Sequence, residues 1–71
     1  MAYNIILFSS VTYALKAQGA FERNGIKSKL EKLKKEQALH GCGYGLKVLN
    51  SDLMRARETS ERERIKIIDI L

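Results

Sequence analysis

Apolar and polar positions follow different periods along the chain, and the changes of period predict its elements. Residues 3–8 are mostly β-branched or aromatic and carry apolar side chains on both faces, which is typical of a central strand. Ser9 and Ser10 come next, and either hydroxyl can cap a helix predicted over residues 11–24. The helical spacing places these side chains on one side of it: Val11, Ala14, Leu15, Gln18 and Phe21.

A strand and a glycine-rich loop are expected after this helix. Gly25 marks the end of the helix, because glycine readily adopts the left-handed conformation needed there. Residues 26–33 alternate between two faces, which predicts a half-exposed strand whose lysines suit the edge of a sheet. Residues 34–45 predict a loop, and residues 46–49 predict a short strand.

The last part of the chain predicts a second helix and a final strand. Asn50 or Ser51 can cap a helix over about residues 52–62, and residues 65–71 predict the strand. At this length, the order strand, helix, strand, strand, helix, strand favours a ferredoxin-like α+β fold. We therefore expect a βαββαβ domain with an antiparallel four-stranded sheet, in the order 4-1-3-2, and two helices on one face.

Composition limits the number of domains and the class of protein. With 71 residues, 45% of them apolar, the chain is long enough for one domain over residues 1–71 and too short for two. The longest apolar run, residues 5–8, is far below the roughly 20 residues of a membrane helix. The N-terminal residues lack a signal-peptide pattern. We expect a cytoplasmic protein with no membrane segment, and the net charge of +5 favours anionic partners.

The single cysteine, Cys42, restricts the chemistry available to the chain. One thiol allows neither an internal disulfide nor a multi-thiolate metal site, so we expect no metal and no other cofactor. A copper chaperone of the same topology would need two cysteines in a CxxC motif. No Ser–His–Asp set and no pair of acids converges on the cysteine loop, so we expect no enzymatic activity.

The predicted topology assigns neighbours to Cys42. The end of strand one lies beside the start of strand three in this fold, so Ser9, Ser10 and the N-terminus of the first helix are expected near the thiol. A helix N-terminus carries partial positive charge and free N–H groups, which make a nearby thiol more acidic and more reactive. Three glycines around the cysteine allow the backbone to approach an anion closely: Gly41, Gly43 and Gly45.

Each of these features also has a purely structural interpretation. Cys42 can be inert, the glycines can be turn residues, and the two serines can serve only as helix caps. His40 can assist the thiol or can be a solvated loop residue. Tyr44 either covers the loop or anchors in the core. Three basic side chains can attract an anionic partner or can form only a solvated edge: Lys32, Lys34 and Lys35.

Two segments of the chain, ILFSSVTYALKAQGAFERNGI and HGCGYGLKV, resemble a known family in sequence and spacing. This is the selenium/sulfur (Se/S) carrier protein-like family, and the resemblance covers about residues 3–70. A Pro-Arg-Glu-like segment that family members often carry ahead of the cysteine is replaced here by Lys35-Glu36. The matching residues are Leu7, Phe8, Ser9, Ala14, Leu15, Lys16, Ala17, Gly25, Ile26, Cys42 and Gly43.

The resemblance implies a small carrier that holds sulfur or selenium on Cys42 as a persulfide or selenopersulfide. The atom would pass between a donor protein, for example a cysteine desulfurase, and an acceptor protein. In this interpretation the amides around Gly43 and the first helix N-terminus stabilise the anion. The alternative is a small interaction or regulatory module in which the cysteine is incidental.

The predicted fold also bears on two further kinds of partner, a second copy of the chain and a nucleic acid. The helices cover only one face of the sheet, and the apolar residues on the other face of the first strand favour a homo-oligomer. Periodicity leaves open whether Ile6 and Phe8 or Ile5 and Leu7 lie on that face. RNA recognition on this fold needs stacking aromatics on strands one and three, and residues 46–49 contain none, which argues against nucleic acid.

Overall fold

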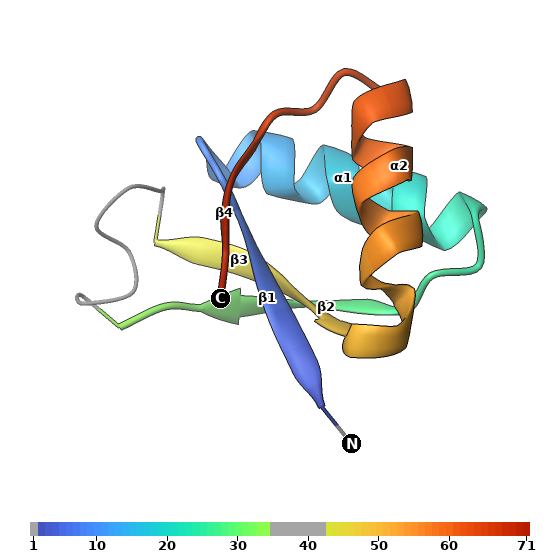
Figure 1. Cartoon of the computed structure of the whole chain (residues 1–71). Coiled ribbons are helices and arrows are strands. Elements are labelled where there is room, and N and C mark those ends of the chain that lie inside the picture. The colour runs from blue at the N-terminus through green and yellow to red at the C-terminus, as the bar shows by residue number, and fades with distance from the viewer. Residues whose placement is uncertain (1, 35–42) are drawn as a thin grey trace.

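The computed structural model describes residues 2–34 and 43–71. Four strands form one antiparallel sheet in the order β2-β3-β1-β4. Figure 1 shows both helices on the same face of this sheet. The expected ferredoxin-like βαββαβ fold is confirmed. The elements are β1 (Tyr3–Phe8), α1 (Val11–Arg23), β2 (Ser28–Lys32), β3 (Tyr44–Leu49), the short 3₁₀ helix η1 (Asn50–Asp52), α2 (Leu53–Arg62) and β4 (Ile67–Ile70).

The core lies between the sheet and the helices, and it decides which side of β1 faces inward. Ile6 and Phe8 are fully buried in this core, whereas Ile5 and Leu7 point to the other face, which we call the open face. Leu7 is also buried, so the open face is less exposed than the sequence suggested. The core residues are Ile6, Phe8, Ala14, Ala17, Phe21, Ile26, Leu46, Val48, Ala56 and Ile65.

Helix α1 begins and ends where the sequence indicated. The hydroxyl of Ser10 accepts a hydrogen bond from the backbone N–H of Tyr13 at 3.2 Å, which makes Ser10 the N-cap. Gly25 has a φ of +71°, and the N–H of Ile26 donates to the carbonyl of Phe21 at 2.8 Å. This left-handed ending satisfies carbonyls of the last turn and directs Ile26 into the core.

The buried side of α1 differs from the predicted one. Leu15 is 51% exposed and Val11 is 39% exposed, while small alanines face the sheet instead. Large side chains such as Phe8 and Phe21 already fill the space between the layers, so close packing favours small side chains on the facing helix. The buried residues of α1 are Ala14, Ala17, Ala20 and Phe21.

The predicted caps of the second helix are wrong. Asn50 lies in η1, and its side-chain amide donates to Asn4 at 2.7 Å instead of capping α2. The backbone N–H of Asn50 also donates to the carbonyl of Ala2 at 3.0 Å, so the residue is held by the beginning of β1. The residue at the actual N-cap position, Asp52, makes no side-chain capping bond.

The boundaries of three strands also shift. β2 and β4 are shorter than predicted, and β3 begins at Tyr44, two residues before the predicted start. Gly45, which the sequence assigned to a loop, is paired with Leu7 on one side and Glu31 on the other. No helix in the part of the chain that the structure describes is long and apolar enough to cross a membrane.

Candidate functional site

The predicted site lies at the end of the sheet where β1 finishes and β3 starts. Leu7 is the partner of Gly45 in the antiparallel register. Continuing that register by two residues on each strand brings Ser9 level with Gly43, the residue that directly follows the cysteine. Figure 1 shows α1 beginning at this end of the sheet. The beginning of α1 and Gly43 therefore lie at the same end of the sheet, whereas the predicted proximity of Cys42 to Ser9 and Ser10 stays a prediction, because Cys42 lies outside the described residues.

Three of the predicted site residues, His40, Gly41 and Cys42, lie outside the described residues, as does Lys35. Lys32 and Lys34 are exposed.

The N-terminus of α1 is electrostatically positive at this end. The helix has 13 residues and no acidic side chain in its first turn, so none of its own carboxylates offsets the free N–H groups there. Ser10 uses its hydroxyl as the cap, whereas Ser9 is exposed. An anion near Gly43 would meet a helix end that is suited to it.

Gly43 has a left-handed backbone conformation, as expected if its backbone is to approach an anion closely. Its φ is +86°, a value that residues with side chains rarely adopt. Among the described residues that are not its chain neighbours, none has a heavy atom within 4 Å of a Cβ atom placed at this position. Its carbonyl accepts a hydrogen bond from Leu33 at 2.8 Å, which ties the residue to the end of β2.

Gly45 has a different role from the one predicted for it. It is buried in β3, and a Cβ atom there would lie 2.6 Å from Ile5 Cγ2 and 3.0 Å from the carbonyl oxygen of Ile6. Glycine is therefore required by close packing against β1 and not by a turn around an anion. The sequence could not distinguish a glycine required by packing from one required by a turn, because each shows only as a glycine close to the cysteine.

Tyr44 is half-buried at the start of β3. Its register partner is Lys32, and successive pairs place it on the same face as Leu46, which belongs to the core. This placement favours the anchoring role over a cover for the loop.

One basic residue near this end was missed by the sequence analysis. Phe8 pairs with Ile67 in the β1–β4 register, so Lys66 follows at about the level of Ser9. Lys66 is exposed, and its charge adds to that of the helix end. The local sequence around Lys66 gives no sign that it lies near Ser9, because this proximity depends on the pairing of Phe8 with Ile67, residues almost sixty positions apart.

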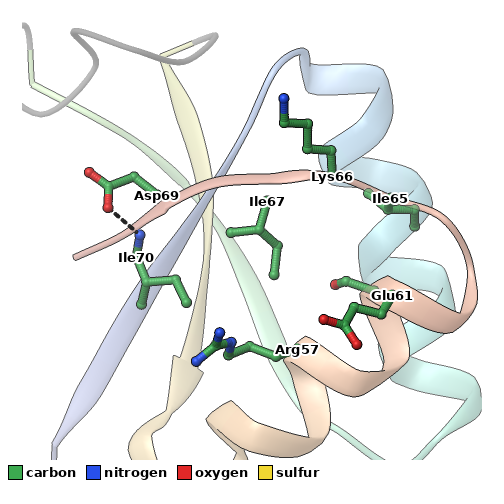
Figure 2. A pocket seen from close by; sticks show the side chains of 8 residues that line it. Arg57, Glu61, Ile65, Lys66, Ile67, Asp69 and Ile70 are labelled. Atoms are coloured by element: carbon green, nitrogen blue, oxygen red, sulfur yellow. Dashed lines mark hydrogen bonds between the residues drawn. The ribbon is translucent and has the colours of Figure 1, made fainter.

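Figure 2 shows the groove between α2 and β4, whose volume is about 490 Å³. Ile67 and Ile70 lie within it and charges of both signs line it, among them Arg57 and Glu61. Asp69 accepts a hydrogen bond from the N–H of Ile70 at 2.8 Å, so it covers a donor at the free edge of the sheet. The groove carries charges of both signs, and the Asp69 carboxylate already accepts a hydrogen bond. Neither feature connects the groove to the chemistry of a thiol.

The described residues hold no cluster of three or more histidine, cysteine, aspartate or glutamate side chains that could bind a metal ion. Their chemistry at the site is limited to a positive helix end, an open left-handed glycine and nearby lysines. Such a site can bind and stabilise an anion.

The fold and site define a class: a small ferredoxin-like domain with a glycine-flanked cysteine following its second strand. A family model described as "Putative Se/S carrier protein-like" matches residues 3–71, nearly the whole chain. The chain belongs to this family, which confirms the resemblance noted in its sequence. No curated protein and no solved structure matches the chain.

Proposed function

We propose that this protein carries sulfur or selenium as a persulfide or selenopersulfide on Cys42, passing it between a donor and an acceptor protein. The observation that carries the proposal is the family match over residues 3–71 in a chain with one cysteine. Any atom held on a thiol must then be held on Cys42. The protein transfers the atom without catalysing a reaction of its own, and needs no cofactor.

Loading is a thiol exchange. The Cys42 thiolate attacks the terminal sulfur of a donor persulfide, a new S–S bond forms, and the old S–S bond breaks. The donor leaves as a thiolate with the electron pair of the broken bond, and Cys42 becomes a persulfide. No external oxidant or reductant is consumed. A cysteine desulfurase is the kind of donor that presents such a persulfide.

Delivery repeats the same chemistry in the other direction. A thiolate on the acceptor attacks the terminal sulfur on Cys42, the S–S bond breaks, and Cys42 returns to a thiolate. The reduced thiols of the cytoplasm are the setting in which we place this exchange. A selenium atom in the terminal position would follow the same two steps.

The described geometry supports this proposal at two points. The positive end of α1 favours a thiolate or persulfide anion near Gly43. No described residue beyond the chain neighbours crowds the Cβ position of Gly43, which favours close approach of a partner to the residue after the cysteine.

The intact mass of the protein after incubation with a persulfide donor tests the proposal. Wild type should gain one sulfur atom, and Cys42→Ser should gain none. Treatment with a reductant should remove the added atom. If folded wild type gains no sulfur from any donor, the alternative of an interaction module with an incidental cysteine is favoured instead.

A further inference from the structure

The open face of the sheet carries a basic concavity at the end of β3 that is farther from Gly43. It has a volume of about 370 Å³ and lies where β1 and β2 begin and β3 ends. Its lining contains three lysines and no carboxylate. We call Tyr3, Lys27, Lys29 and Lys47 the basic patch. The complete lining is Tyr3, Lys27, Ser28, Lys29, Lys47 and Leu49.

Two lysines of the basic patch are direct neighbours on adjacent strands. Lys29 is the direct register partner of Lys47 in the β2–β3 ladder. Like charges at directly opposite positions destabilise a sheet, because their Cβ atoms are only about 5 Å apart. The Lys47 ammonium lies over the ring of Tyr3, 4.5 Å from its centroid.

Among the described residues, no ion pair includes Lys29 or Lys47. The two ion pairs given by the structure for residues 2–34 and 43–71 join Arg23 to Glu63 and Arg55 to Asp52, and neither reaches the basic patch. Lys27 and Lys29 are exposed, and Tyr3 is 50% exposed. Apart from the contact of Lys47 with the Tyr3 ring, no ion pair among the described residues offsets the repulsion between Lys29 and Lys47, whereas an anion from outside would be attracted to both.

We propose that the basic patch is a docking surface for an acidic segment of a partner protein. Charge complementarity selects this occupant. A second copy of the chain stacked on this face would bring lysines against lysines. Single-stranded nucleic acid needs several free aromatic rings, whereas here the ring of Tyr3 is covered by Lys47, and Tyr44 lies on the face of Leu46.

The basic patch and Gly43, the residue after the cysteine, can belong to one interface. Lys47 comes four positions after Gly43 in the chain, a span of about 13 Å at the rise of a strand. A typical protein interface covers about 800 Å² on each partner, which is wide enough to include both. The inference rests on the proposed carrier function only for the identity of the partner, which would be the sulfur donor or acceptor.

A binding experiment with a labelled peptide of consecutive glutamates tests the proposal. Lys29→Gln with Lys47→Gln removes two charges from the patch. Lys16→Gln with Arg57→Gln removes two charges from exposed positions on the helices and serves as the matched control. The patch variant should bind the peptide about tenfold more weakly, and the control should lose at most about threefold. The patch variant should also melt at the same or a higher temperature, because a like-charge pair is gone.

Four results would overturn the proposal. They are no peptide binding by wild type, equal losses in both variants, tighter patch-dependent binding of an oligouridylate than of the peptide, and a wild-type dimer that the patch variant dissociates. Cys42→Ser should bind the peptide as wild type does, so this test stands even if no sulfur is ever loaded on the thiol.

Discussion

Gly43 and Gly45 are two residues apart and require glycine for different physical reasons. Gly43 has a positive φ and open space around it, whereas Gly45 is packed against β1. Substitution by alanine should therefore strain the backbone at Gly43 and create a steric clash at Gly45.

Gly45→Ala should lower the free energy of unfolding by about 1–3 kcal/mol, because its Cβ would overlap Ile5 and the backbone of Ile6. Chemical denaturation measures this. Adding Ile5→Ala to the same chain should recover part of the loss, since the nearest clashing atom belongs to that side chain. A Gly45→Ala protein as stable as wild type would contradict the packing role.

Gly43→Val should cost about 1–3 kcal/mol through the positive φ and should also impair sulfur loading. Gly43→Asn serves as the control, because asparagine tolerates a left-handed backbone better than valine does. Loading and melting temperature are measured together. If Gly43→Val loads normally while its melting temperature falls, Gly43 is a structural residue only, and its part in stabilising the anion is wrong.

Ser60 presents a buried hydroxyl on α2. It is 1% exposed, and its Oγ has no hydrogen-bond partner among the described residues. A buried polar group without a partner costs about 1–3 kcal/mol. Ser60→Ala should therefore leave stability unchanged or raise it. A marked loss of stability on thermal unfolding would show that the hydroxyl is satisfied.

At the scale of elements, the sequence was most informative where a local signal determines the structure. Ser10 and Gly25 delimit α1 as expected, because capping and left-handed termination depend on a few neighbouring residues. The lysines of β2 correctly indicated an edge strand.

The errors arose where distant contacts override local signals. The rotation of α1 that exposes Leu15 is set by packing against the sheet. Asn50 bonds to Asn4, which is 46 residues away in the chain. The position of Lys66 beside the site and the Lys29–Lys47 pairing depend on register, which no local pattern reveals.

Capping offers a test at this scale. Ser10→Ala should lower the free energy of unfolding by about 1 kcal/mol, because the N–H of Tyr13 loses its partner. Ser9→Ala is the matched control and should change stability little, since Ser9 is exposed and does not cap the helix. Equal effects of the two changes on the melting temperature would refute the assignment of the cap.

At the scale of the whole molecule, the fold brings a positive helix end and the glycine after the cysteine to one end of the sheet, and gathers three lysines on the open face. In this account the helix end stabilises the thiolate, and the lysines bind the acidic segment of a partner protein. The homo-oligomer expected from the apolar open face stays a prediction, to be checked by sedimentation.

The helix end predicts an acidic thiol. A thiolate near partial positive charge is stabilised, so the midpoint of Cys42 alkylation with pH should fall below roughly 8.5, the value of a free thiol. Thr12→Glu adds a carboxylate to the first turn and should move the midpoint upward, because it disfavours a second negative charge nearby. Met54→Glu, at an exposed position on α2, should leave it unchanged. A wild-type midpoint at or above the free-thiol value would remove the electrostatic part of the account.

The most direct test of the central claim follows a labelled sulfur atom through one cycle. The protein is loaded from a donor persulfide that carries radioactive sulfur, separated from the donor, and mixed with an acceptor thiol. The account predicts that label is bound by wild type and not by Cys42→Ser, that it moves to the acceptor, and that the freed protein can be loaded again. Label that binds equally to Cys42→Ser, or that cannot be passed on, would contradict a carrier function for Cys42.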